Sequence, residues 1–231
     1  MSISTLHLTT SDVNIHFMDA IMDRRRTYKG ASNEERRTER RQKLLDAAMK
    51  VYGAVGYHGA TVKAICAEAG LTERYFYESF ENGEALLAAA YLAVMERLTG
   101  EITAAITALP RHDMGTVART TLTTYYALLR DNPNEARVFL VEILGVSPAI
   151  DRIYWDTIRA ASFAVLRFAP DATEKARGLG LDLELFADGL VGAVVQIALG
   201  WVRSGYAAPI ETAVDTAMAI LGAVNRQFTA G

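Results

Sequence analysis

The residues best suited to chemistry lie in one stretch, residues 61–80, which reads TVKAICAEAGLTERYFYESF. Its hydrogen-bonding groups include two hydroxyls, one guanidinium and two phenols, at Thr61, Thr72, Arg74, Tyr75 and Tyr77. Each of these groups can donate a hydrogen bond, and the phosphates and base edges of a nucleic acid accept such bonds. These residue types therefore suit contact with a nucleic acid.

Two short helices must position these groups. Val62, Ile65, Cys66 and Ala69 recur at spacings of three and four, which predicts a first helix capped by Thr61. The glycine that follows suits the left-handed conformation that closes such a helix. A second threonine can cap the next helix, where the glutamate after it faces the positive end of the helix dipole.

The turn between these helices predicts a helix-turn-helix motif. Two short helices joined by a short turn that contains glycine make this arrangement, and residues 69–72, AGLT, are that turn. The second helix of such a pair lies in the major groove and presents its first residues, here 72–75, to base edges. Three consecutive aromatic residues cannot all face one core, because successive residues point about 100° apart. We therefore expect Phe76 to enter the core and Tyr77 to point to another side.

The charge of the chain is unevenly distributed. The whole chain carries −3, yet residues 24–43 contain nine basic and three acidic residues, a net +6 that leaves −9 for the remainder. A basic block on an acidic body favours a local anionic partner. Such a run is also common in a solvated linker or helix start, so it supports nucleic-acid binding only together with the motif above.

A set of features in residues 40–87 points to a known family. They are Gly56-Tyr57, Thr61-Val62, Ile65, Ala69-Gly70, Phe76-Tyr77, Phe80 and Glu84-x-Leu86. As a set they resemble the N-terminal domain of TetR-family transcriptional regulators. Residues 188–205, DGLVGAVVQIALGWVRSG, resemble the eighth helix of the same family.

The resemblance implies a DNA contact surface. Thr61 and Tyr77 would contact phosphates, and Arg74 would read a base because a guanidinium pairs bidentately with guanine. Arginines 36, 37, 40 and 41 would follow adjacent phosphates or enter a minor groove. The complete expected set is Arg36, Arg37, Arg40, Thr61, Val62, Thr72, Glu73, Arg74, Tyr75 and Tyr77.

One position departs from the family pattern. Many members carry a phosphate-binding lysine where this chain has Gly83, just inside the fourth helix. The backbone N–H groups at that helix start could still bind a phosphate. A positive charge is nevertheless missing, which puts the strength of DNA binding in question.

The whole chain predicts helices, with no convincing strand. We expect an all-α protein of about nine helices: a three-helix helix-turn-helix DNA-binding domain followed by a C-terminal bundle for ligand binding and dimerisation. The expected domains are a flexible basic arm at 1–33, the DNA-binding domain at 34–86 and the bundle at 87–231. Beyond the motif, helices are expected at about 83–109, 113–131, 134–145, 148–168, 182–204 and 209–227, with a soft segment, PDATEKARGLG, at 170–180.

The helix at 182–204 predicts a homodimer. Small residues recur along one of its faces and bulky apolar residues along another, which an intrachain core alone would also explain in part. The resemblance implies that the remaining apolar surface of this helix forms the interface of a two-fold dimer. The paired recognition helices of that dimer would select a near-palindromic operator. The expected interface is Phe186, Gly189, Leu190, Ala193, Ile197 and Trp201.

The bundle is expected to enclose a small-molecule effector, by the same resemblance. Aromatic residues mixed with a few polar groups suit such a pocket, although aromatics at helical spacing are more often simply core. The candidates are Tyr125, Tyr126, Phe139, Glu142, Tyr154, Trp155, Ile158, Phe163 and Gln196. This mixture favours a small, mostly apolar effector.

Other functions have little support. The four histidines are scattered, so neither a catalytic site nor a metal site is expected, and no cofactor is implied. The single cysteine, Cys66, excludes an internal disulfide and suits the cytoplasm, while residues 190–202 are too short to span a membrane. We expect a cytoplasmic repressor released from its operator by the effector. The alternative is a helical ligand-binding or protein-interaction bundle with weak or lost DNA binding.

Overall fold

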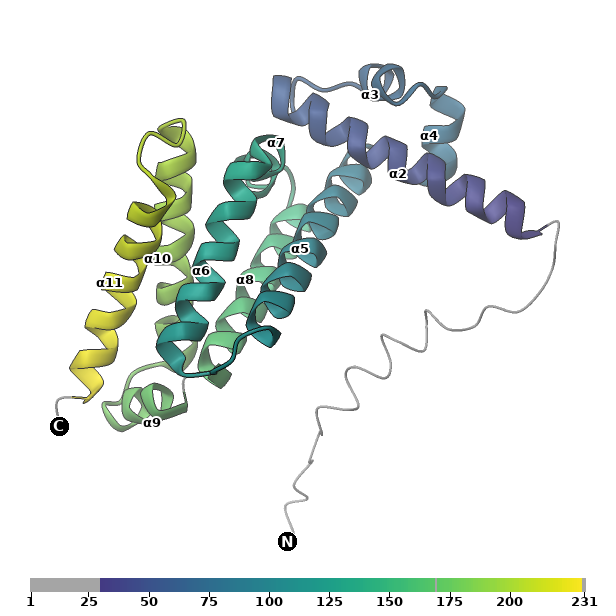
Figure 1. Ribbon diagram of the computed structural model, residues 1–231. Helices are drawn as coiled ribbons and strands as arrows, with labels where there is room; N and C mark the ends of the chain where they lie inside the picture. The colour runs from purple at the N-terminus through teal and green to yellow at the C-terminus, as the bar shows by residue number, and fades with distance from the viewer. Residues whose placement is uncertain (1–29, 169, 230–231) are drawn as a thin grey trace, which may run out of the picture. The chain divides into compact units, whose positions relative to one another are not determined.

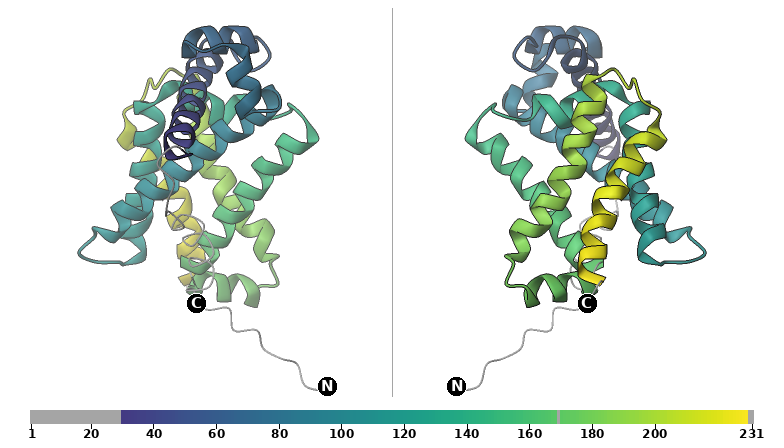
Figure 2. Two further views of the ribbon diagram at one scale, coloured as in Figure 1. Left: turned by 90° about the vertical axis from the view of Figure 1, so that its right-hand side faces the viewer. Right: turned by 90° about the vertical axis from the view of Figure 1, so that its left-hand side faces the viewer.

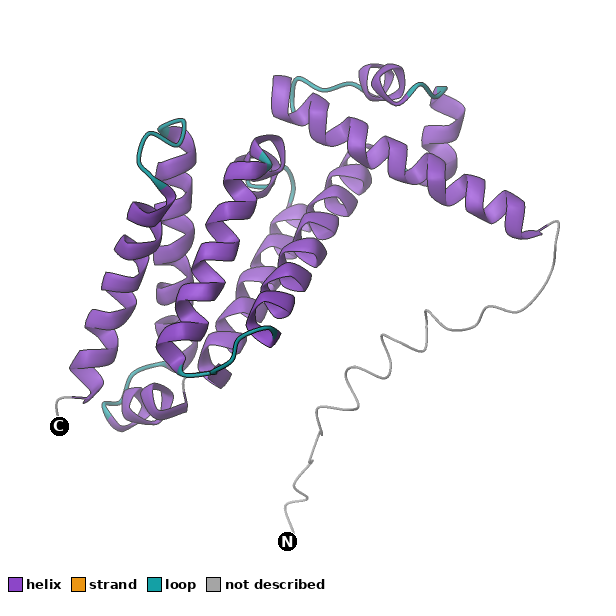
Figure 3. Cartoon of the chain, in the orientation of Figure 1, coloured by secondary structure: helices purple, strands orange, loops and turns teal. Residues whose placement is uncertain are grey.

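The computed structural model describes residues 30–168 and 170–229, and every regular element in these ranges is a helix (Figure 3). The expected all-α class is therefore confirmed. Residues 1–29 of the expected arm lie outside the described residues, whereas its last four residues, 30–33, begin the first helix. The chain divides into two units at residue 40, and the contacts described below lie within the second, residues 41–231.

The three N-terminal helices are α2 (Gly30–Val55), α3 (Val62–Ala69) and α4 (Glu73–Ser79) (Figure 1). The Thr61 hydroxyl caps α3 by accepting the N–H of Ala64 at 3.1 Å, as its position predicts. Gly70 ends α3 in the left-handed conformation, with φ of 65°, where a side chain would be strained. Thr72 is the N-cap residue of α4, but its side chain makes no capping hydrogen bond.

The bundle is built from long helices that run side by side (Figures 1 and 2). Asparagine or aspartate side chains cap three of them, at Asn82, Asp113 and Asp182. The elements are α5 (Gly83–Thr107), α6 (Met114–Asp131), α7 (Pro133–Arg137), η1 (Val138–Glu142), α8 (Pro148–Phe168), α9 (Pro170–Gly178), α10 (Leu183–Arg203) and α11 (Ile210–Thr229).

Two predicted segments differ from the structure. The single helix expected at 134–145 is instead the short α7 followed by η1, a π-helical turn. The segment expected to be soft contains the helix α9, so that prediction was wrong. Within the described residues, only one side chain of α9, Ala176, is fully buried. A helix that buries so little of its surface needs no apolar periodicity, and that periodicity is the signal by which a sequence predicts a helix.

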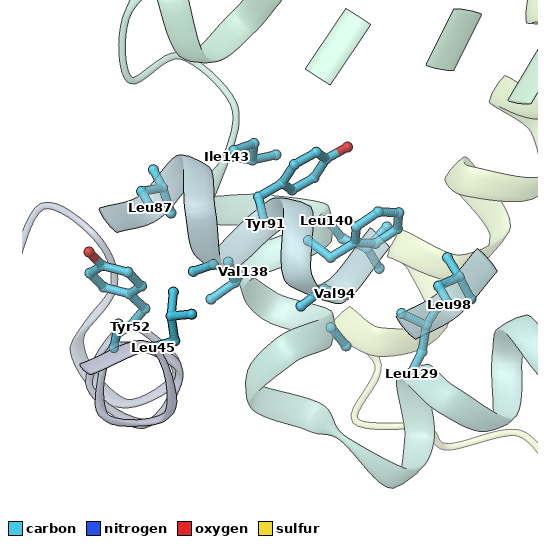
Figure 4. Packing of buried hydrophobic residues seen from close by; sticks show 14 of the residues in the cluster. Leu45, Tyr52, Leu87, Tyr91, Val94, Leu98, Leu129, Val138, Leu140 and Ile143 are labelled. Atoms are coloured by element: carbon cyan, nitrogen blue, oxygen red, sulfur yellow. The ribbon is translucent and has the colours of Figure 1, made fainter. Parts of the chain in front are cut away.

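The hydrophobic core is continuous along α5. Leu45 and Tyr52 of α2 lie near Leu87 at the start of this helix, and the buried row continues through Tyr91 to Leu98 (Figure 4). Val138, Leu140 and Ile143, from η1 and the residue after it, join the same core. Burial of each large apolar side chain contributes about 1.5–3 kcal/mol, so α5 is held by packing from its start to Leu98.

Candidate functional site

The outward face of α4 carries the groups expected to contact DNA. The Arg74 side chain is 84% exposed, and its Nε donates to Oε1 of Glu78 at 3.0 Å. Tyr77 is also exposed, whereas Phe76 is fully buried and its ring lies 5.9 Å from that of Phe80. The expected inward orientation of Phe76 is thus confirmed. An exposed i,i+4 ion pair contributes only about 0.3–0.5 kcal/mol, so Arg74 can leave Glu78 at little cost.

The remaining expected contacts of the motif differ in their surroundings. Thr61 and Thr72 are exposed, and the Thr61 hydroxyl accepts its capping bond while its own proton remains able to donate. Glu73 is exposed in the first turn of α4, where its negative charge suits the helix dipole better than a phosphate. Val62 packs against the core, and Tyr75 is half-buried.

The arginines of α2 fall into two groups. Arg36 and Arg37 are exposed and Arg40 is half-buried, all within the unit formed by residues 1–40. The guanidinium of Arg41 lies 4.8 Å from the ring centre of Phe80, in a cation–π contact. This contact ties α2 to the residue that ends α4.

Gly83 is the first residue of α5, and Asn82 before it caps the helix through a 2.9 Å bond from the N–H of Ala85. A Cβ at position 83 would meet only the Tyr57 hydroxyl, at 3.8 Å, which is an ordinary van der Waals distance. The position therefore has room for a long side chain.

A cluster of aromatic side chains fills the middle of the bundle. The rings of Tyr91 and Phe139 are stacked, with centres 5.6 Å apart and planes inclined by 11°. Tyr125 meets Phe139 edge-on at 6.3 Å and also contacts Tyr126. Among the described residues, the hydroxyls of Tyr91 and Tyr125 are buried without a hydrogen-bond partner. An unpaired buried hydroxyl is unfavourable, so this cluster is a candidate for binding a polar group of a ligand.

The phenols of this cluster are neutral at ordinary pH. Burial raises the pKa of Tyr91 to about 12; the nearby Thr157 hydroxyl lowers it by less, although the Thr157 hydroxyl donates to the carbonyl of Ile153 and its geometry to Tyr91 is not that of a hydrogen bond. Burial also raises the pKa of Tyr125 far above its usual value, with smaller contributions from neighbouring tyrosines. Sequence reasoning missed Tyr91, although its place four residues after Leu87 and three before Val94 marks the buried side of α5.

Other expected pocket residues lie elsewhere. Trp155, which is 58% exposed, and Phe163 lie on the outer face of α8, and Gln196 is exposed on α10. Phe163 nevertheless lines a small hollow between α8 and α10, together with Arg159 and Glu184. Tyr154 and Ile158 are half-buried, and the Glu142 carboxylate is bound to Arg137 rather than open to a ligand.

The expected dimer residues also divide into two groups. Phe186, Leu190, Ala193 and Ile197 are half-buried and Gly189 is exposed. Trp201 is buried in the chain's own core, where its Nε1–H donates to the carbonyl of Ala208 at 2.8 Å and its ring meets those of Tyr126 and Tyr206. The prediction that Trp201 lies in the dimer interface is therefore corrected: Trp201 belongs to the interior of the chain. The sequence shows only that Trp201 lies on an apolar face of the helix, and such a face can pack either inside the chain or against a second copy.

α10 has an apolar surface that the chain does not cover. By length and composition alone it could cross a membrane, and only 17% of its most apolar 18-residue window is buried. Leu185 on this helix is 72% exposed, and Trp155 and Phe163 are exposed on α8, which packs against α10. Large exposed apolar patches mark protein–protein or membrane interaction sites.

No group of three histidine, cysteine, aspartate or glutamate side chains in the described residues could hold a metal ion. Cys66 is buried, and burial raises the pKa of its thiol, which lowers its reactivity.

Comparison with known proteins gives the following relationships. Residues 44–90 match the family model described as bacterial regulatory proteins, tetR family. The fatty acid degradation regulator FadR from Bacillus halodurans has a similar solved structure, with 19% identity, coverage of 79% of this chain and 94% of that chain, and a TM-score of 0.68.

Two further solved structures are similar. FadR from Bacillus subtilis in complex with stearoyl-CoA gives 18% identity, coverage of 78% and 96%, and a TM-score of 0.66. A TetR-like transcriptional regulator from Rhodococcus sp. RHA1 gives 21% identity, coverage of 83% and 96%, and a TM-score of 0.64. No curated protein sequence matches the chain.

Proposed function

We propose that the chain is a repressor of the kind that the family model of bacterial regulatory proteins, tetR family, describes, since residues 44–90 match that model. It binds a near-palindromic operator as a homodimer and leaves it when a small, mostly apolar effector binds. Residues 34–86 form its DNA-binding domain and residues 87–231 its effector and dimer domain. A regulator of this kind acts in the cytoplasm, where it can reach its operator.

The observation that carries DNA binding is the face of α4. Arg74 and Tyr77 point outward from a short helix that Phe76 anchors in the core. In a helix-turn-helix motif this helix enters the major groove, where a guanidinium can pair with a guanine. Thr61 stands at the start of α3, where a hydroxyl and backbone N–H groups suit a phosphate.

The uncovered surface of α8 and α10 supports the homodimer. These two helices from each protomer would pack as a four-helix interface, with Trp155, Phe163 and Leu185 joining the glycine-rich face of α10. A two-fold axis makes one patch contact its own copy. It would also place two copies of α4 so as to read two half-sites of an operator.

The aromatic cluster supports an effector with an apolar body and an uncharged hydrogen-bonding group. The cluster offers stacked rings and two unpartnered phenols, Tyr91 and Tyr125, and both phenols remain neutral at ordinary pH. A structurally similar regulator was solved with stearoyl-CoA, whose long acyl chain and thioester carbonyl have this character, although its CoA part is charged. Acyl-CoA esters are therefore the first effectors to test.

The test is a gel-shift titration with DNA from upstream of the protein's own gene. We expect specific binding whose affinity falls steeply with salt, because phosphate contacts release counterions. Stearoyl-CoA should release the DNA, and light scattering should show a dimer. Absent or salt-insensitive binding would overturn the repressor and support a bundle that has lost DNA binding. Binding that no acyl-CoA reverses would leave the repressor in place and reject this effector class.

A further inference from the structure

Residues 137–147, which connect α7 to α8, contact the N-terminal helices and the start of α5 through three hydrogen bonds. Arg137 Nη1 donates to the carbonyl of Gly53 at 3.0 Å. The backbone N–H of Tyr57 donates to Oε2 of Glu142 at 2.7 Å, and the Ser147 hydroxyl donates to Oε2 of Glu84 at 2.8 Å. We call the Arg137 and Glu142 contacts the junction.

The junction satisfies groups that the end of a helix leaves unpaired. The last carbonyls of α2 have no partner within the helix, and Arg137 supplies one to Gly53 together with a positive charge that suits the negative end of the helix dipole. Arg137 uses its other edge to hold Glu142, with Nε at 2.8 Å from Oε1. The Glu142 side chain is only 10% exposed, so these charge-assisted bonds are partly shielded from water.

Two glycines allow this close approach. A Cβ at Gly53 would lie 2.2 Å from Oδ1 and 2.6 Å from Cβ of Asn134, so the α7 segment would have to move. Gly56 has φ of 77° and would place a Cβ 3.1 Å from Oε2 of Glu142. The backbone at Gly53 and Gly56 therefore lies directly against the side chains of Asn134 and Glu142, with no space for a side chain of its own.

The same segment faces the aromatic cluster on its other side. Phe139, in the π-helical turn between Arg137 and Glu142, stacks on Tyr91 and meets Tyr125 edge-on. The neighbouring Val138 and Ile143 are fully buried beside α5 (Figure 4). A π-turn is an uncommon conformation that is frequently found at functional sites. Any displacement of Phe139 must therefore be transmitted to the two charged residues that flank it.

We propose that Arg137 and Glu142 are positioning residues for DNA binding: they hold the end of α2, residues 53–57, in the orientation that operator binding needs. An effector that displaces Phe139 breaks the junction and frees this end of α2. This inference rests on the proposed function and specifies its regulation. An effector can shift the protein between two states only if it binds one of them better than the other. In this proposal the two states differ at Phe139: in one its ring is stacked on Tyr91 and the junction is intact, and in the other the effector has displaced the ring and the junction is broken.

Glu142→Gln and Arg137→Gln test the junction, with Arg119→Gln as the matched control. Arg119 forms an ion pair of similar length with Asp215, between α6 and α11, away from residues 53–57. Anisotropy with the upstream DNA should show affinity about tenfold lower for either junction variant, as expected for a lost hydrogen bond to a charged group. The slope of affinity against salt should stay unchanged, because neither residue touches a phosphate.

Hydrogen exchange at the Tyr57 amide provides a second measurement, which does not depend on DNA. This amide should exchange faster in both junction variants and at the wild-type rate in Arg119→Gln. The double variant should lose little more affinity than either single one, because the two residues act as one unit.

The outcomes separate the two hypotheses. If the wild type binds no DNA, the proposed function fails and this inference fails with it. If the wild type binds DNA but the junction variants match Arg119→Gln in affinity and in Tyr57 exchange, only the inference is overturned. If a junction variant unfolds, Phe139→Leu decides: loss of the stacked ring should speed Tyr57 exchange in a folded protein, and an unchanged rate contradicts the inference.

Discussion

The backbone N–H of Tyr57 donates to the carboxylate of Glu142 across 2.7 Å, although 85 positions separate the two residues. Tyr57 follows the turn that ends α2, and Glu142 ends the π-helical turn η1. One hydrogen bond thus joins the helix that precedes the DNA-binding motif to the segment that packs on the aromatic cluster. The predictions below examine the surfaces on either side of this connection.

Arg74→Ala should weaken binding of the operator by about 1–3 kcal/mol and relax base preference at one position in each half-site. The side chain is 84% exposed, so the free energy of unfolding should change by less than about 0.5 kcal/mol. Binding measured against a library of operator variants checks both effects. A uniform loss across all sequences would instead make Arg74 a phosphate contact.

Gly83→Lys should strengthen DNA binding and increase the salt slope by about one, because it adds a phosphate-binding charge. The position has room, since a Cβ there meets only the Tyr57 hydroxyl at 3.8 Å. Gly100→Lys, at an open position farther along α5, is the control for the added charge alone. Equal gains from both variants would show that net charge, rather than position 83, is responsible.

Leu185→Arg should convert the dimer to a monomer and abolish cooperative operator binding, because Leu185 is exposed on the uncovered apolar face of α10. Ile220→Arg, on the exposed side of α11, should leave the dimer intact if α8 and α10 alone form the interface. Light scattering distinguishes the two variants. A monomer caused by Ile220→Arg would place α11 in the interface instead.

Alkaline pH should destabilise the fold through the buried phenols. The pKa of Tyr91 is raised to about 12 from an ordinary value of 10.0, so the folded state holds this proton more tightly than the unfolded state does. Its contribution is complete below pH 10 and is lost as the pH rises to 12. Denaturant unfolding should show a smaller loss over this range for Tyr91→Phe than for the wild type. Tyr77→Phe, at an exposed position, should behave like the wild type.

Much of the N-terminal architecture is predictable because it depends on neighbours in sequence. Thr61 caps α3 through the amide three residues later, and Gly70 ends α3 in the left-handed conformation. Phe76 and Phe80 are buried four residues apart, as one face of a helix requires. Each of these assignments needs only helical geometry and the conformational limits of one residue.

The junction and the uncovered surface could not be predicted in the same way. Glu142 meets Tyr57 through a π-turn, and the extra residue in that turn changes which side chain points inward. Trp201 and Trp155 both lie on apolar helical faces, yet the first is buried and the second is exposed. Sequence periodicity identifies an apolar face, but only the packing of distant helices decides whether the same chain covers it.

The contacts of residues 137–147 have a practical consequence for chimeric regulators. A graft that exchanges residues 34–86 for those of another protein would also replace Gly53, Tyr57 and Glu84, the three partners of this segment. A foreign side chain at position 53 would collide with Asn134. A new DNA specificity could then be gained while the response to effector is lost, unless residues 134–147 are transplanted together with the DNA-binding domain.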